Sequence, residues 1–159
     1  MRVTNAMWIV VAATAVTATL VWFVISEMNS GNLDIESTSC NVEAFGNSPF
    51  EHLVPAHDGD QVTISGWAAD VEGKRIAKDV TLFLVNVDGK RFQIGVGKPS
   101  IDRDDVVAAF KTAAVRRSGF SIPSTVTVPR SGDYEIAVVG RFDPTDLICH
   151  PRKIVRVAK

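Results

Sequence analysis

The sequence predicts an all-β domain built as a two-sheet sandwich, with one short helical turn and a single transmembrane α-helix in front of it. Residues 7–25 form an apolar run without a charged side chain, and the rest of the chain alternates short apolar segments with Gly, Pro, Asn and Asp. An apolar run of about 20 residues is what a helix needs to cross a bilayer, whereas short strands between turn residues are typical of sandwiches. The chain therefore divides into a short cytoplasmic leader (1–6), a transmembrane signal anchor (7–25), an extracytoplasmic linker (26–39) and a β-sandwich domain (40–159).

The predicted transmembrane helix, Met7–Ile25, would be roughly 28 Å long, close to the hydrocarbon thickness of a bilayer. Trp8 and Trp22 lie near its two ends, where amphipathic rings prefer the headgroup layers. Arg2 precedes the run, and positive charge is retained on the cytoplasmic side. We therefore expect a single-pass protein of the cytoplasmic (inner) membrane. Its N-terminus would lie on the cytoplasmic side, and its domain in the periplasm or the extracellular space. The alternative is a cleaved signal peptide, whose apolar core is normally shorter, about 7–15 residues.

The same helix carries small side chains four residues apart. Ala15 is followed by Thr19, and Thr14 by Ala18. Such small-xxx-small pairs let two membrane helices approach closely, so Ala15, Ala18 and Thr19 are candidates for docking against another integral membrane subunit. The alternative is that Ala and Thr are common in membrane helices and that this one is only an anchor.

The two cysteines stand at the start and near the end of the predicted domain, at Cys40 and Cys149. An extracytoplasmic compartment is oxidising, and one pair has only one intramolecular connectivity. A bridge would tie the first strand to the last and close a loop of about 110 residues. Two free buried thiols, or a link to another chain, are the alternatives. No metal site is predicted, because the three histidines are not clustered.

The predicted domain consists mostly of strands and turns. Residues 61–67 alternate, with Val62 and Ile64 on one face and Trp67 on the other. The Asp88-Gly89 step predicts a hairpin. Within 102–113, apolar residues recur at helical spacing after Asp104 or Asp105, either of which is a suitable N-cap. This pattern predicts a turn or two of helix. About seven short strands argue for an immunoglobulin-like sandwich. The predicted strands are 61–67, 79–86, 91–97, 120–122, 125–128, 134–139 and 154–157.

Five motifs follow one another along this region: Gly66-Trp67-Ala68-Ala69-Asp70, Arg103-Asp104-Asp105-Val106, Ser118-Gly119-Phe120, Gly132-Asp133-Tyr134 and Cys149. Their order resembles a family of bacterial extracytoplasmic sandwich domains, similar to immunoglobulin or fibronectin type III modules. That family has the layout Gly-Trp-Ala-x-Asp, Arg-Pro-Asp-Val, Ser-Gly-Phe, Gly-x-Tyr, Cys; this sequence has Asp104 in place of the Pro. The resemblance covers about residues 40–159. It implies a domain of membrane or surface proteins, some linked to polysaccharide handling, without a shared catalytic activity.

The side chains of these motifs favour a structural role. We expect Trp67 to bury its ring between the sheets, and Gly66 and Gly119 to allow close packing or an irregular backbone. Tyr134 resembles a corner tyrosine, whose hydroxyl caps a backbone group. The functional alternative makes Trp67 an exposed platform for a sugar, with Asp70 and Arg103 as hydroxyl ligands.

No enzyme, cofactor or nucleic-acid site is predicted. The chain lacks a legible Ser-His-Asp set and the Walker and Rossmann glycines. Asp102, Asp104 and Asp105 lack the central Gly of a calcium-binding loop. With 17 basic and 18 acidic residues, the formal net charge is −1 and the basic residues are interspersed with acidic ones, which is unlike a nucleic-acid-binding domain.

These observations predict a non-catalytic, membrane-anchored module. We expect an accessory or assembly subunit that docks on a larger membrane protein complex through its helix and its outer domain. The alternative is a carbohydrate- or cell-envelope-binding module. A redox-active or signalling domain is disfavoured because the sequence has no Cys-x-x-Cys.

Overall fold

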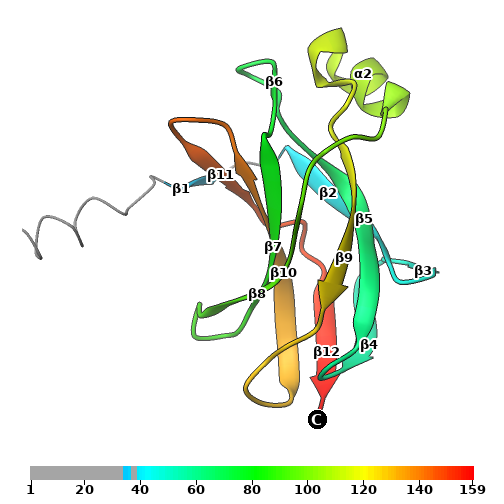
Figure 1. The fold of residues 1–159 in the computed structure, drawn as a ribbon, viewed down its shortest axis with the longest axis vertical. Coiled ribbons are helices and arrows are strands. Elements are labelled where there is room, and N and C mark those ends of the chain that lie inside the picture. The colour runs from blue at the N-terminus through cyan, green and yellow to red at the C-terminus, as the bar shows by residue number, and fades with distance from the viewer. Residues whose placement is uncertain (1–33, 37–38) are drawn as a thin grey trace, which may run out of the picture. The chain divides into compact units, whose positions relative to one another are not determined.

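The computed structural model describes residues 34–36 and 39–159, which form two β-sheets packed face to face (Figure 1). We call the seven-stranded sheet (β1, β4, β7, β8, β10, β11, β12) sheet A and the five-stranded sheet (β2, β3, β5, β6, β9) sheet B. The strands are β1 Asp34–Glu36, β2 Cys40–Phe45, β3 Ser48–Pro49, β4 Leu53–His57, β5 Gln61–Asp70, β6 Arg75–Ile76, β7 Asp79–Val85, β8 Arg91–Gly97, β9 Gly119–Thr125, β10 Gly132–Arg141, β11 Asp146–Cys149 and β12 Ile154–Ala158; the helical segments are α2 Asp104–Phe110 and the 3₁₀ turn η1 Ala113–Val115.

Strand β10 is the centre of sheet A. One side of it pairs with β7, and β8 continues the sheet beyond β7. On its other side, the first half of β10 pairs with β12 and the second half with β11. Two parallel strands complete the sheet, β4 beside β12 and β1 beside β11. Strand β1 lies within the segment predicted as linker, so part of that segment belongs to the folded domain.

Strand β5 is the centre of sheet B, between β2 and β9. The prediction of two separate strands, 120–122 and 125–128, is wrong. A single strand, β9, runs without a break through Pro123 and ends at Thr125. Within the described residues β9 pairs along its length only with β5. A proline at such an edge position removes no ladder hydrogen bond when its nitrogen faces away from the neighbour.

The core lies between the two sheets and follows from the alternation of side chains along each strand. Sheet A contributes Val80, Leu82, Leu84, Ile136 and Val138, and sheet B contributes Val42, Ile64, Phe120 and Ile122, all nearly inaccessible to solvent. A second, smaller cluster of Ala69, Val106 and Val115 lies where α2 and η1 pack on the end of β5. Helix α2 is therefore held by its own small core.

The strand order is immunoglobulin-like. Strands β5 and β9 pair in one sheet while β7, β10 and β12 are neighbours in the other, which corresponds to the B–E and C–F–G pairs of that fold. Tyr134, at the start of β10, is buried and its hydroxyl donates a hydrogen bond to the carbonyl of Arg130 at 2.7 Å. This is the arrangement expected of a corner tyrosine.

The turn or two of helix predicted within 102–113 is confirmed, because α2 has seven residues, which is about two turns. It begins at Asp104, and Arg103 is at the N-cap position without a side-chain cap hydrogen bond, so neither Asp104 nor Asp105 caps it. It ends where Lys111 adopts a left-handed backbone conformation, with φ of +53°. The carboxylate of Asp105 bonds Arg103 instead.

The predicted transmembrane helix lies outside the described residues, together with Trp8, Trp22, Ala15, Ala18 and Thr19. Among the residues that the structure describes, no helix has the length and the apolar character needed to cross a bilayer.

Candidate functional site

The two cysteines form a disulfide, which confirms the predicted pairing. Cys40 in β2 is bonded to Cys149 in β11, with the Cα atoms 6.1 Å apart. The bridge therefore joins sheet B to sheet A. It does not reach the last strand as predicted, because β12 follows β11. Both cysteines are buried.

Trp67 does not lie between the sheets, which corrects the prediction for its ring. Its neighbours along β5, Gly66 and Ala68, are the buried, inward-facing residues, and Trp67 faces outward. The ring is half-buried because α2 covers it: it meets the ring of Phe110 edge to face, with centroids 5.7 Å apart. Trp67 therefore anchors the helix to the outside of sheet B.

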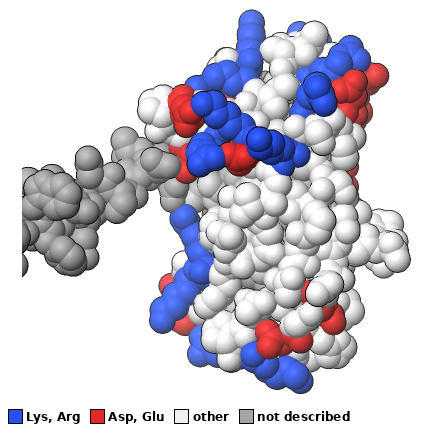
Figure 2. Space-filling view, in the orientation of Figure 1, with Lys and Arg blue, Asp and Glu red and all other residues white. Residues whose placement is uncertain are grey.

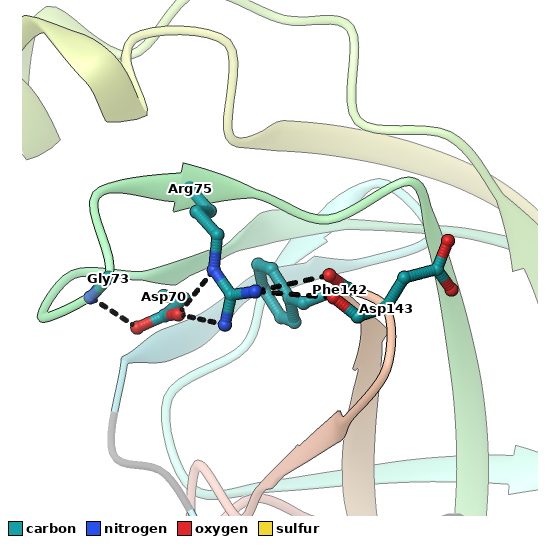
Figure 3. A network of polar contacts seen from close by, with 5 residues as sticks. All are labelled: Asp70, Gly73, Arg75, Phe142 and Asp143. Atoms are coloured by element: carbon teal, nitrogen blue, oxygen red, sulfur yellow. Dashed lines mark hydrogen bonds and ion pairs between the residues drawn. The ribbon is translucent and has the colours of Figure 1, made fainter.

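Asp70 closes the β5–β6 hairpin and holds Arg75, which joins that hairpin to the turn after β10 (Figure 3). Its carboxylate accepts hydrogen bonds from the backbone of Gly73 at 2.8 Å and from Arg75 Nε and Nη2 at 2.9 and 2.6 Å. The same guanidinium lies over the ring of Phe142 and donates to the carbonyls of Phe142 and Asp143, so it links β6 to the turn after β10. Burial disfavours the charged carboxylate, but these hydrogen bonds outweigh it and lower the pKa of Asp70.

Arg103 joins the start of α2 to strand β2. Its guanidinium forms two hydrogen bonds with Glu43, at 2.9 and 2.7 Å, and two with Asp105, at 2.9 and 2.5 Å. The stem of Arg103 passes so close to Gly119 that an added Cβ there would lie 2.9 Å from its Cγ. Arg103 and Asp70 are thus both engaged by protein groups, and neither is presented as an open ligand for a sugar hydroxyl.

The ion pair of Arg103 predicts a dependence of stability on pH. The hydrogen bond from Arg103 lowers the pKa of Asp105 to about 2. A carboxylate whose pKa is depressed by folding stabilises the fold above its unfolded pKa, and this contribution is lost as pH falls towards 2. We expect Arg103→Gln to be less stable than the unchanged chain at pH 5 and the difference to shrink at pH 2. Urea unfolding at both pH values measures it.

A matched control is Arg117→Gln. Arg117 is exposed and lies 3.9 Å from Asp102, and such exposed pairs contribute little. We expect its stability difference from the unchanged chain to be small at both pH values. A gap for Arg103→Gln that stays constant between pH 5 and pH 2 would contradict the role given to the pair with Asp105.

The structure also shows a surface that the sequence analysis missed. The outer side of sheet A has an apolar patch across β7, β8 and β10, where the register places Val96 opposite Thr81, Thr81 opposite Val139, and Phe83 opposite Ala137. Polar side chains border this patch, because Phe83 also lies opposite Gln93, and Val85 lies opposite Arg91 and Glu135. We call Thr81, Phe83, Val85, Val96 and Val139 the sheet A face. Val96 is 52% exposed and the other four are half-buried. These side chains point away from the core that Leu82 and Val138 help to form.

A shallow groove of about 250 Å³ lies on this face. Val96, Val139 and Thr81 line one part of it, and Asp79, Arg141 and Asp146 line the other. Arg141 is paired with Asp79, and this hydrogen bond raises the pKa of Arg141. The groove therefore combines an apolar floor with a charged rim, which is the usual anatomy of a protein-binding surface.

One sequence signal could have revealed this face. Strand β7 reads Val-Thr-Leu-Phe-Leu-Val over 80–85, and β10 reads Ile-Ala-Val-Val over 136–139. A strand with one side in solvent alternates apolar and polar residues, whereas a near-continuous apolar run indicates a strand that is covered on both faces. The runs therefore predict that something packs on the outer side of sheet A.

No protein-family model matches the chain, and no curated protein matches it either. A crystal structure of a chicken TCR is similar, with 10% sequence identity and a TM-score of 0.38. The match covers 76% of this chain and 54% of the TCR chain, so this chain spans about half the length of that structure. The description of the domain as an immunoglobulin-like sandwich rests on its own sheets and strand order.

Proposed function

We propose that this chain is a non-catalytic, single-pass membrane protein whose extracytoplasmic domain docks on a larger membrane assembly as an accessory subunit. The sheet A face is the docking surface. The observation that carries the proposal is the apolar character of β7 and β10 on both of their sides: Leu82 and Val138 face the core, while Phe83 and Val139 face outward.

Burial of the sheet A face by a protein partner accounts for its composition. Removing apolar surface from water contributes roughly 25 cal/mol per Å², and aromatic and aliphatic side chains at the centre of an interface provide most of the binding energy. The ion-paired rim of Asp79 and Arg141 supplies orientation, because complementary charges fix the register of two partners.

The predicted membrane anchor supports the same proposal. A domain tethered beside its partner in one membrane binds at a high effective concentration, so a modest interface is sufficient for a stable complex. The predicted small-residue pairs of the helix, with Ala15 and Ala18, add a second contact within the bilayer.

The test introduces one charge into the docking surface. Val96→Glu places a carboxylate at the most exposed side chain of the sheet A face, where a bound partner would bury it at a high energetic cost. We expect at least a tenfold weaker association, roughly 1.4 kcal/mol. The tagged full chain is extracted from its native membranes with a mild detergent, and size-exclusion chromatography with mass spectrometry measures the fraction that migrates with a membrane assembly.

Val87→Glu is the matched control. Val87 is 90% exposed at the turn between β7 and β8, outside the sheet A face, and the substitution is chemically identical. We expect it to leave the association unchanged. Recovery of the unchanged chain alone, as a monomer or homodimer, would refute the subunit proposal; equal recovery of the assembly with both variants would refute the sheet A face as its docking surface.

A further inference from the structure

The outer side of sheet B has a different chemistry from that of sheet A. Its outward side chains on β5 and β9 are uncharged and, except for Pro123 and Trp67, polar; opposite residues share the face: Gln61 with Thr125, Thr63 with Pro123, and Ser65 with Ser121. We call these six residues the sheet B lane. Figure 2 shows that the surface over the middle of β5 and β9 carries no charge, whereas Lys, Arg, Asp and Glu gather at the two ends of the domain and along its opposite, left-hand margin. The sequence agrees, because residues 61–69 and 119–129 contain no charged side chain.

The lane is hollowed at one end. A shallow depression of about 460 Å³ is lined by Gln61, Thr63, Pro123 and Thr125, together with Val62 and Ser124. In the middle of the lane the hydroxyls of Ser65 and Ser121 share a hydrogen bond at 3.3 Å. The hydroxyl and amide groups along the lane both donate and accept hydrogen bonds.

Trp67 extends the lane at its other end. Gln61, Thr63, Ser65 and Trp67 alternate along β5 and therefore share its outer face. From Gln61 to Trp67 the lane is about 20 Å long, at roughly 3.3 Å per residue. The indole is half-buried by Phe110, and its remaining exposed part offers an apolar ring surface beside the hydroxyls.

We propose that the sheet B lane binds a neutral, extended glycan chain. A glycan presents many hydroxyl groups that both donate and accept hydrogen bonds, and its ring faces are apolar enough to pack on an indole. The side chains of the lane are uncharged, and the charged pair that flanks its Trp67 end, Arg103 with Glu43, is already bonded within the protein. Hydroxyl and amide side chains in this setting match a ligand of this kind. Binding sites of this type fix a ligand by a few placed polar groups beside an aromatic surface.

An extended peptide fits this face less well. Peptides that bind to sheets do so by adding a strand at a free edge, where main-chain hydrogen bonds are available. Strand β5 pairs with β2 over residues 64–68 and with β9 on its other side, so the free edge beside the lane belongs to β9. Pro123 in β9 has no backbone N–H to donate, and a proline of this kind blunts an edge against strand addition. The lane also lacks the large exposed apolar side chains that anchor a protein partner. It lies on the opposite sheet from the proposed docking surface, so the two proposals stand independently.

Nuclear magnetic resonance titration of the full chain in detergent micelles tests the proposal. The probes are pentasaccharides of β-1,4-linked glucose, α-1,4-linked glucose, β-1,4-linked N-acetylglucosamine and mannose, with heparin oligosaccharides as the acidic comparison. We expect at least one neutral probe to shift the amide signals of β5 and β9 in a saturable manner, with a weaker response to heparin. The absence of saturable shifts from every neutral probe at millimolar concentration would overturn the proposal.

Two variants locate the site. Thr63→Glu puts a charge into the exposed depression of the lane without touching the core, and we expect it to weaken binding of the responding probe at least tenfold. Val96→Glu, on the sheet A face, is expected to bind the probe as the unchanged chain does. If Thr63→Glu binds equally well, or if both variants lose binding alike, the sheet B lane is not the glycan site.

Discussion

Replacing both Cys40 and Cys149 with alanine is expected to lower the free energy of unfolding by about 4 kcal/mol. The two residues are 109 positions apart in the sequence, so the bridge restrains most of the unfolded domain. The loss of chain entropy in the unfolded state grows with the length of the closed loop. A domain of this size has a total stability of about 5–15 kcal/mol, so the variant loses a large part of it. Urea unfolding of both forms measures the difference.

The position of the bridge adds a second consequence. Because Cys40 belongs to sheet B and Cys149 to sheet A, the bond joins the two layers of the sandwich. Unfolding the native chain in urea with a thiol reductant is expected to give nearly the same midpoint as the alanine pair. A double variant whose unfolding free energy lies within about 1 kcal/mol of the oxidised chain would contradict this account, since removing a native bridge from a small secreted domain typically costs about 2–5 kcal/mol.

Much of the sandwich could be predicted from local patterns in the sequence. The turn at Asp88-Gly89 joins β7 to β8 as expected, and the bounds of β8 match the predicted 91–97. These features depend on neighbours in the chain, such as an alternating pattern and a turn residue that tolerates positive φ; Gly89 has φ of +75°. Pairing of the two cysteines was also predictable, because a single pair allows one connectivity.

The face of β5 on which Trp67 lies was predicted, but what covers its ring was not. A large aromatic residue in a strand is normally part of the core, and alternation alone placed it opposite Ile64. The ring is covered on the outside of sheet B because α2 packs there, and that contact brings together β5 and a helix about 40 residues later. Tertiary packing of this kind has no local signature in the sequence.

The roles of Asp70 and Arg103 also involve distant segments of the chain, directly for Arg103 and through Arg75 for Asp70. Glu43, 60 residues away in the chain, pairs with Arg103. Asp70 bonds Arg75, five residues away, and Arg75 in turn donates to the carbonyl of Phe142, 67 residues further along. The sequence identified both residues but not what they bind. The sheet A face was not predicted for a different reason. A continuous apolar run predicts a strand, but it does not show which of the strand's two apolar sides faces the core and which faces solvent in the isolated domain.

Gly66→Ala is expected to destabilise the domain by roughly 3 kcal/mol or more, above the usual range for overpacking. Gly66 faces inward in β5, and an added Cβ would lie 2.1 Å from the carbonyl oxygen of Asn41 and 3.0 Å from Val42 Cα and the ring of Phe120. The first two contacts are backbone atoms of β2, so a change of side-chain rotamer does not relieve them. Alanine also lowers the conformational entropy of the unfolded chain, which favours folding by only about 0.4–1 kcal/mol. The clash outweighs this gain, so the net change in the free energy of unfolding is destabilising.

Ser65→Ala, one residue earlier on the outer side of β5, is the matched control for urea unfolding, and we expect a change of about 0.5 kcal/mol or less. A double variant, Gly66→Ala with Phe120→Leu, separates the two sources of strain. Because Leu relieves only the contact with the ring, and shortening a buried Phe is itself destabilising, we expect no recovery of stability. Recovery to near the unchanged chain would show that the ring, not the backbone of β2, limits the space at this position, and that β2 can move away from β5 at little cost.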